Sequence, residues 1–89
     1  MSIYVYASCK NYSRSVSRDV VIQEVGRVLM LPFRPHIMLL VTSSIDKNAR
    51  IIASRAGFIV VEIGFKVTRE NFDRAYRVLR AKLNPIFRK

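Results

Sequence analysis

Three short apolar runs, at residues 3–7, 37–41 and 59–63, are separated by stretches of mixed polarity. Each run is rich in β-branched, aromatic or aliphatic residues and is bounded by polar residues or glycine, a pattern typical of β-strands. The middle run, at residues 37–41, has no polar alternation at all. A strand with this composition is usually covered on both faces, as in a parallel sheet.

The segments between and after these runs have the periodicity of amphipathic helices. We expect the first helix to be capped by Ser15 or Ser17 and to run to about Leu31, because prolines follow it. We expect the second to begin at Ser44 or Asp46 and to end at Gly57 in left-handed conformation.

A third helix is predicted from a cap at Thr68 to Pro85. Apolar residues that recur at helical spacing form one stripe of this helix, which we expect to be buried: Phe72, Ala75, Tyr76, Leu79 and Leu83.

The strict alternation of strand and helix with short connections predicts an α/β fold. We expect one domain, residues 1–89, in a minimal three-layer β-α-β-α-β-α arrangement around a three-stranded parallel sheet. Ligands of such sheets usually bind beyond the carboxyl ends of the strands. The polar cluster that follows the first strand, residues 8–12, is therefore the first place to look for function.

The chain is short, and its expected sheet has two edges that carry almost no charge. Small domains bury a low fraction of their surface, and unprotected strand edges tend to pair with other chains. We therefore expect a homodimer, formed across an edge strand or through helix faces.

The charge balance points to an anionic partner. Sixteen Lys plus Arg face six Asp plus Glu, for a formal net charge of +10, and eleven of the sixteen are arginine. Arginine's planar fork fits phosphate oxygens, so nucleic acid, and duplex DNA in particular, is the expected partner. The alternative is that these residues only solvate helix faces.

Several classes of protein are not expected. No apolar stretch approaches the roughly 18 residues that span a bilayer, and no signal peptide is evident, so we expect a cytoplasmic protein without a membrane partner. Cys9 is the single cysteine and His36 the single histidine. They cannot form a disulfide or supply a zinc site of four side chains, so no metal or cofactor is expected.

Two pairs of stretches resemble the PD-(D/E)XK nuclease superfamily, in particular its type IV restriction endonuclease-like domains. Residues 4–12 (YVYASCKNY) with 21–26 (VIQEVG) resemble the strand and following helix of the nuclease core. Residues 41–50 (VTSSIDKNAR) with 53–60 (ASRAGFIV) resemble the next strand-helix-strand segment. The resemblance covers roughly residues 3 to 65 and implies a reduced restriction-endonuclease-like core.

The residues that carry nuclease chemistry in this superfamily are not matched. Lys10 fits the lysine of the motif, but Ser8 stands where a metal-binding carboxylate is expected, and no acid precedes the first strand. Magnesium-dependent hydrolysis needs anionic oxygen ligands. Glu62 lies on a strand, and its expected role is a charge near a sheet edge or a pair with an arginine, in preference to metal ligation. We therefore expect no catalytic residues, and an enzymatic role is disfavoured although not excluded.

Candidate nucleic-acid-binding residues remain. Lys10, Arg14 and Arg18 form the best basic cluster beside the strand ends, and Arg77 and Arg80 give the third helix an excess of positive charge. Weaker candidates are Asn11, which is also a common turn residue, and Gln23, which matches a polar position in some relatives but is an ordinary exposed helical residue.

Three functions stay open at this point. The first is a non-catalytic nucleic-acid-binding module that contacts the phosphate backbone through a basic face. The second is a subunit of a composite Mg²⁺-dependent nuclease whose acids come from another chain. The third is a small homo-oligomeric scaffold or regulator with no nucleic-acid role.

Overall fold

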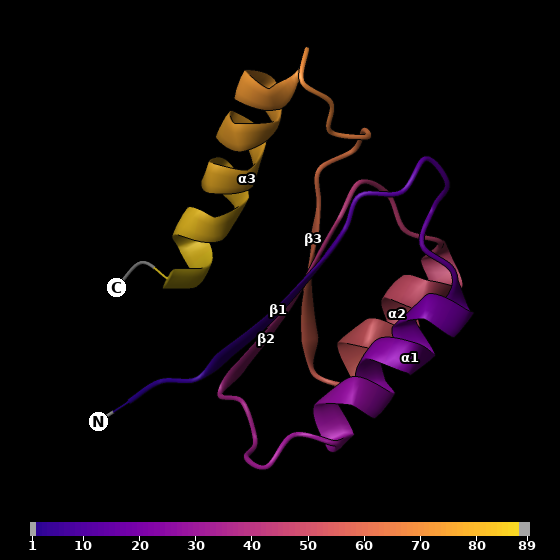
Figure 1. Ribbon diagram of the computed structural model, residues 1–89, viewed down its shortest axis with the longest axis vertical. Helices are drawn as coiled ribbons and strands as arrows, with labels where there is room; N and C mark the ends of the chain where they lie inside the picture. The colour runs from indigo at the N-terminus through magenta and orange to yellow at the C-terminus, as the bar shows by residue number, and fades with distance from the viewer. Residues whose placement is uncertain (1, 88–89) are drawn as a thin grey trace.

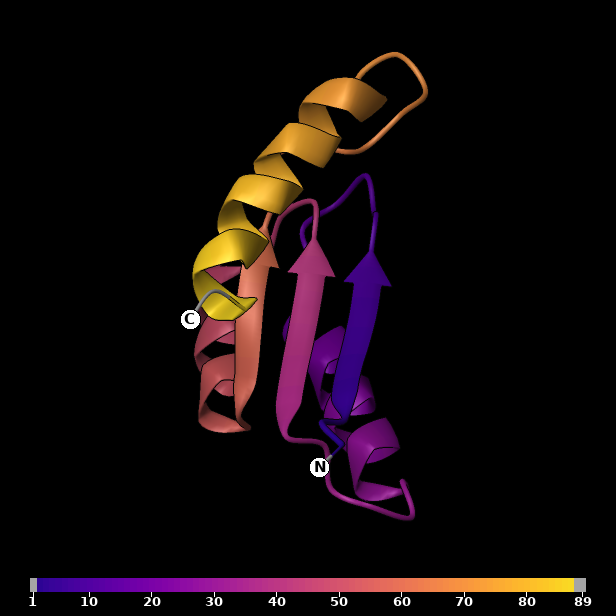
Figure 2. The ribbon, with the colours of Figure 1, turned by 90° about the vertical axis from the view of Figure 1, so that its left-hand side faces the viewer.

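The computed structural model describes residues 2–87 and contains three strands that alternate with three helices. Along the chain these are β1 (Val5–Lys10), α1 (Arg18–Leu29), β2 (Ile37–Thr42), α2 (Lys47–Arg55), β3 (Phe58–Glu62) and α3 (Phe72–Phe87). The strands form one parallel sheet in the order β1-β2-β3, as Figure 2 shows. The predicted α/β fold with a three-stranded parallel sheet is therefore confirmed.

The helices form two layers around the sheet, as predicted. Helices α1 and α2 lie side by side on one face, whereas α3 lies on the opposite face, next to β3 (Figure 1, Figure 2). In Figure 2 the part of this second face over β1 and β2 has no helix in front of it. The two layers therefore cover the sheet unequally.

The main hydrophobic core lies between the sheet and the α1–α2 layer, and a smaller group on the α3 side consists of Leu39, Val41, Val61 and Ala75. In each helix one row of small or branched residues meets the sheet, which is what helical spacing of apolar residues produces. Gly57 has φ +99° and so ends the α2 turn in left-handed conformation, as expected. The fully or nearly buried core residues are Val16, Val21, Leu40, Ile45, Ala49, Ala53 and Phe58.

The first two helices begin where predicted, with Ser17 and Asp46 as N-caps. Helix α1 ends at Leu29, two residues before the expected Leu31. Leu29 itself is 78% exposed, so it does not belong to the buried row.

The predicted start of the third helix at Thr68 is wrong, since α3 begins at Phe72. The side chain of Asn71 accepts a hydrogen bond from the Thr68 backbone N–H at 2.8 Å and donates one to the Lys66 carbonyl at 2.9 Å. These contacts stabilise a turn, and the Asn71 carbonyl then accepts the first helical hydrogen bond, from Ala75. Asn71, and not Thr68, therefore fixes the helix start.

The predicted end at Pro85 is also wrong, because α3 continues through Pro85 to Phe87. A proline this close to a helix end removes one hydrogen bond but leaves few later turns to disrupt.

The expected burial of the α3 stripe is largely wrong as well. Only Ala75 is buried, at 4% exposure, whereas Phe72 is 59% and Tyr76 53% exposed. Helix α3 contacts the sheet mainly along β3, and one flank of its apolar stripe stays exposed.

Candidate functional site

The three strands end at one edge of the sheet in a row of polar side chains. The register places Lys10 beside Thr42 and Thr42 beside Glu62. Because side chains alternate between the faces of a sheet, all three project to the same side, toward α1 and α2. This is the edge at which function was expected, and we call it the carboxyl edge.

A buried carboxylate from α1 meets this row. Glu24 is 1% exposed, and its Oε1 lies 2.5 Å from the Nζ of Lys10, which is itself only 13% exposed. Arg27 approaches the same oxygen at 2.8 Å from the solvent side, and the Tyr6 hydroxyl donates to Oε2 at 2.7 Å. Strand β1 and helix α1 are therefore joined by a charged cluster beneath the helix.

The protonation behaviour of this cluster follows from its contacts. Burial alone would raise the pKa of Glu24, but hydrogen bonds from Lys10, Tyr6 and Ser8, with the charge of Lys10, lower that pKa below its ordinary value. The hydrogen bond to Glu24, together with burial, raises the pKa of Tyr6. Glu24 is thus held as the anion and Tyr6 as the neutral phenol.

Sequence reasoning placed Lys10 on the nucleic-acid surface and assigned no partner to Glu24. In the structure the Lys10 ammonium is neutralised by a buried acid, so its main contact is internal. The sequence holds one signal of this: Glu24 lies among Val21, Val25 and Val28, in the apolar row of α1. An acid in such a row requires a buried counter-charge.

Asn11, the next residue along the chain, holds two loops together. Its side-chain oxygen accepts from the Val67 N–H at 2.8 Å, and its side-chain nitrogen donates to the Val67 carbonyl at 2.9 Å. This two-bond clamp joins the loop after β1 to the loop after β3. This contact agrees with a structural role in a turn, which was the alternative to nucleic-acid binding for Asn11.

Two cations reach solvent at the carboxyl edge without an ion-pair partner among the described residues. Arg14 is exposed in the loop after β1, and Lys66 donates to the neutral hydroxyl of Ser13 at 3.1 Å. The contact places Lys66 beside the loop that carries Arg14. Lys66 was not identified from the sequence, although it follows the end of β3, and the ends of parallel strands share one edge.

The third cation predicted here, Arg18, has a different setting. It is exposed at the start of α1 but lines a shallow hollow with Asp19 and Asp46. Two acids beside it weaken the attraction of this position for an anion.

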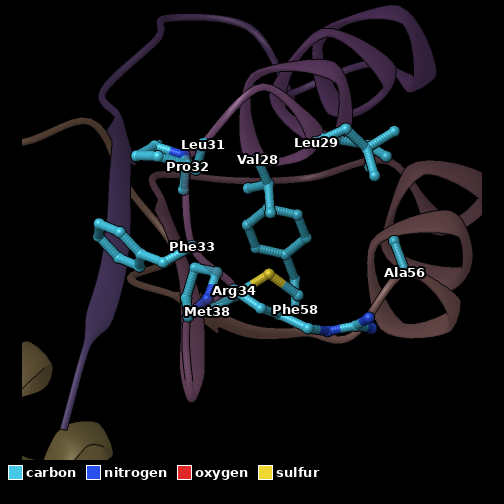
Figure 3. A pocket seen from close by; sticks show the side chains of 11 residues that line it. Val28, Leu29, Leu31, Pro32, Phe33, Arg34, Met38, Ala56 and Phe58 are labelled. Atoms are coloured by element: carbon cyan, nitrogen blue, oxygen red, sulfur yellow. The ribbon is translucent and has the colours of Figure 1, made fainter.

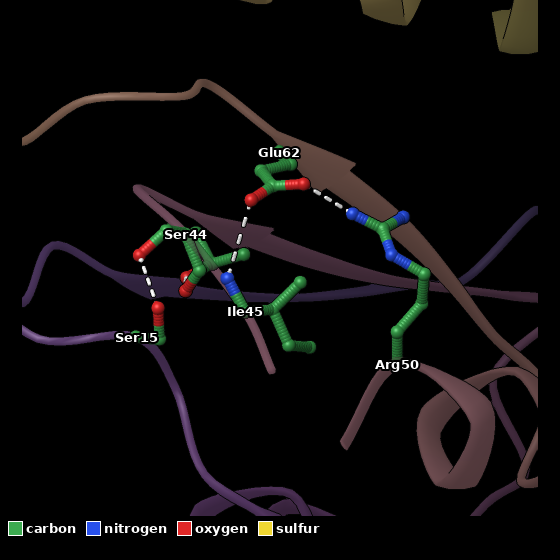
Figure 4. Close-up of polar contacts among 6 residues, drawn as sticks. Ser15, Ser44, Ile45, Arg50 and Glu62 are labelled. Atoms are coloured by element: carbon green, nitrogen blue, oxygen red, sulfur yellow. Dashed lines mark hydrogen bonds and ion pairs between the residues drawn. The ribbon is translucent and has the colours of Figure 1, made fainter. Parts of the chain in front are cut away.

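Glu62 pairs with an arginine, as predicted. Its Oε1 accepts from Arg50 of α2, and its Oε2 accepts from the Ile45 backbone N–H at 3.3 Å (Figure 4). On the neighbouring loops the hydroxyls of Ser15 and Ser44 lie 2.9 Å apart. The polar groups at this end of the sheet are therefore largely committed to holding strands, loops and helices together.

The remaining predicted residues lie away from this edge. Gln23 is exposed on α1, and Arg77 and Arg80 are exposed on α3. At 100° per residue, these two arginines fall on the side of α3 opposite Ala75, which faces the sheet. The structure therefore does not bring Lys10, Gln23 and the α3 arginines into one site.

The molecule also has an apolar hollow of about 330 Å³ at the opposite end of the sheet (Figure 3). Val28, Met38 and Phe58 form part of its wall, and Arg34 is its single charged lining residue. Within residues 2–87 no group of three or more His, Cys, Asp or Glu side chains could hold a metal ion. No helix in this range is both long and apolar enough to cross a membrane.

No protein-family model matches this chain, and no curated protein or solved structure matches it either. The resemblance to nucleases therefore stays a prediction that rests on the quoted sequence stretches.

Proposed function

We propose that this protein is a non-catalytic nucleic-acid-binding module that contacts the phosphate backbone through the basic rim of its carboxyl edge. The observation that carries the proposal is the distribution of ion pairs. Among residues 2–87 the basic side chains in ion pairs are Lys10, Arg27 and Arg50. All other described Lys and Arg residues are exposed without such a partner.

The alternative role for the α3 arginines, pairing along the helix, lacks support. The sequence offers Asp73 with Arg69 or Arg77 at a spacing of four residues, yet neither pair is within ion-pair distance. Arg69 also precedes the helix, which begins at Phe72. The positive charge of this surface is therefore available to a polyanion.

Among these exposed basic residues, Arg14 and Lys66 are the most favourable candidates for phosphate contacts. They project from two loops that Asn11 joins, so the binding groups are held by a fixed frame. Neither is within ion-pair distance of an acid in the described chain, and neither shares a hollow with two acids as Arg18 does. Such contacts recognise phosphate and give little sequence preference.

A matched pair of double variants tests the proposal on duplex DNA. Arg14→Ala with Lys66→Ala removes two charges at the carboxyl edge, and Arg34→Ala with Arg55→Ala removes two exposed charges near the other end of the sheet. Each phosphate contact contributes a slope of about −0.9 to the dependence of log K on log salt. The first variant should therefore flatten this slope by about 2, and the second should leave it nearly unchanged.

Two outcomes would count against the proposal. Equal slopes for the two double variants would mean diffuse attraction without a site at this edge. A third variant, Arg77→Ala with Arg80→Ala, measures whether α3 contributes phosphate contacts of its own. Absence of binding by the parent protein at about 0.1 M salt, where screening is moderate, would reject the proposal and favour the scaffold alternative.

A further inference from the structure

One face of the sheet carries an apolar surface that the described chain leaves open. Tyr6, Ser8 and Lys10 of β1 face α1, so the alternate residues Val5, Ala7 and Cys9 project to the face of α3. All three are exposed, with Val5 at 46%. The neighbouring side chains of β2 and β3 on this face are also apolar and carry no charge. Ile37 is half-buried and Ile59 is 40% exposed, whereas Leu39, Val41 and Val61 are buried.

Helix α3 borders this open area with an apolar flank. Lys82 and Ile86 line a hollow with Arg50 of α2 and with β3, so their side of the helix lies over the outer edge of the sheet. Around the helix these two residues lie close to Ala75, which faces the sheet. Helix α3 runs down in front of β3 in Figure 2, so its right-handed turn directs the flank about 60–120° beyond Ala75 toward β2 and β1. That side carries three large exposed aromatic residues, Phe72, Tyr76 and Phe87, at 59%, 53% and 50% exposure.

The total surface shows how much of the molecule remains to be covered. A compact monomer of this mass, 10.3 kDa, exposes about 5,300 Å². This chain exposes 6637 Å². The excess is roughly 1,300 Å², more than the ~800 Å² that each partner buries in a standard interface.

We infer that this open face is the interface of a homodimer, in which the aromatic flank of α3 from each chain covers the exposed β1 surface of the other. The face has two parts, the projecting flank of α3 and the flat strand surface beside it. In a two-fold contact the flank of each chain lies on the flat surface of the other, so one interface covers both parts. Each aromatic ring has about 100 Å² exposed, which such a contact would bury. The absence of charge on the described strands of this face lets two basic molecules meet there.

Pairing through the free edge of β1 is the competing arrangement. It would extend the sheet to six strands but leave Val5, Ala7 and Cys9 exposed, and the apolar area would become larger and continuous. Large exposed apolar areas are rare on monomers and mark interfaces. Contact through the face removes this area, whereas contact through the edge does not.

Cys9 supplies a native probe, because it is the single cysteine and lies on the proposed interface. The experiment measures mass by analytical ultracentrifugation, and alkylation of the thiol by a maleimide, across protein concentrations. We expect a dimer at high micromolar concentration and at least a tenfold slower alkylation there than after dilution. Tyr76→Asp should yield a folded monomer by circular dichroism, with fast alkylation at every concentration.

The matched control is Leu29→Asp, which places the same charge on an exposed apolar residue of α1, 78% exposed on the other side of the sheet. It should remain dimeric with a protected thiol. A monomeric parent would overturn the inference, as would a dimer whose Cys9 stays reactive, which is the result of edge pairing. A dimer disrupted by Leu29→Asp and not by Tyr76→Asp would place the interface on α1 and overturn it equally.

Discussion

Replacement of Lys10 by methionine should destabilise the protein strongly, although this lysine lies at a strand end near the surface. The substitution keeps most of the side-chain volume and removes the ammonium group 2.5 Å from Glu24 Oε1. Glu24, at 1% exposure, would then be a buried carboxylate without its lysine partner. Keeping the charge while it is buried costs free energy, and so does giving up either one. The expected change is therefore electrostatic and not a loss of packing.

The magnitude follows from distance and burial. At an effective dielectric constant of 20, charges 2.5 Å apart attract each other by roughly 6–7 kcal/mol, before the cost of desolvating them. Removing one partner of a buried pair costs about 3–5 kcal/mol. Because Arg27 and Tyr6 still contact the carboxylate, we expect the low end, about 3 kcal/mol, in the free energy of unfolding.

The chain contains its own control. Arg27 contacts the same Glu24 oxygen at 2.8 Å, but its side chain is 62% exposed. Exposed ion pairs contribute less than about 1 kcal/mol, so Arg27→Met should cost far less than Lys10→Met. Urea unfolding at pH 7 measures both. The double variant Lys10→Met with Glu24→Leu should recover most of the loss, because it leaves no unpaired buried charge.

The same measurement repeated against pH tests the cause. The pKa of Glu24 is lowered by folding, so its contribution to stability is present above the ordinary value near 4.5 and is lost as pH falls through the lower, folded-state pKa. Glu24→Gln should reduce this acid-dependent loss. Equal costs for Lys10→Met and Arg27→Met, or an unchanged acid dependence in Glu24→Gln, would refute the assignment of Lys10 as a structural partner.

Two further predictions concern the backbone and the chemistry. Gly57→Ala should destabilise the fold by about 1–2 kcal/mol, since φ is +99° and the new Cβ would lie 2.9 Å from Met38 Cε. Gly26→Ala adds a methyl group in open space in the middle of a helix and should stabilise the fold by about 0.5–1 kcal/mol. Thermal unfolding of both variants checks the contrast. The isolated chain should not cleave DNA or RNA with Mg²⁺ or Mn²⁺, because Ser8 stands in place of the expected acid; metal-dependent cleavage that Lys10→Ala abolishes in a folded variant would contradict this.

The strands were predictable because their signal is local. The run at residues 37–41 is apolar at every position, and the structure places it in the centre of the sheet. The start of α3 was not predictable, because it depends on the Asn71 side chain. This side chain accepts a hydrogen bond from the Thr68 N–H and donates one to the Lys66 carbonyl. Burial of the α3 stripe was mispredicted for a different reason: periodicity identifies which residues share a face but not whether anything covers that face.

The candidate site was predictable in place, and in the pairing of Glu62 with an arginine, but not in the pairing of Lys10. Lys10 was correctly located at the carboxyl edge, since strand ends can be read from the sequence. That Glu24 lies opposite it depends on the crossing of α1 over β1, which no local pattern encodes. The clamp between Asn11 and Val67 likewise joins residues 56 positions apart. The residue types at the edge can be read along the chain, whereas the tertiary contacts determine which of its charges are paired.

Salt separates the two proposals, because it acts on them in opposite directions. Each chain carries a formal charge of +10, so two chains repel each other, and added salt screens that repulsion and favours the dimer. The same salt weakens binding to nucleic acid through counterion release. Arg77 lies on the side of α3 away from both the sheet and the aromatic flank, so it stays accessible when the open face is covered. If the dimer is the binding form, added salt should therefore raise the fraction of dimer and lower the affinity for DNA. Nucleic acid, which neutralises the charge, should itself favour the dimer at low salt.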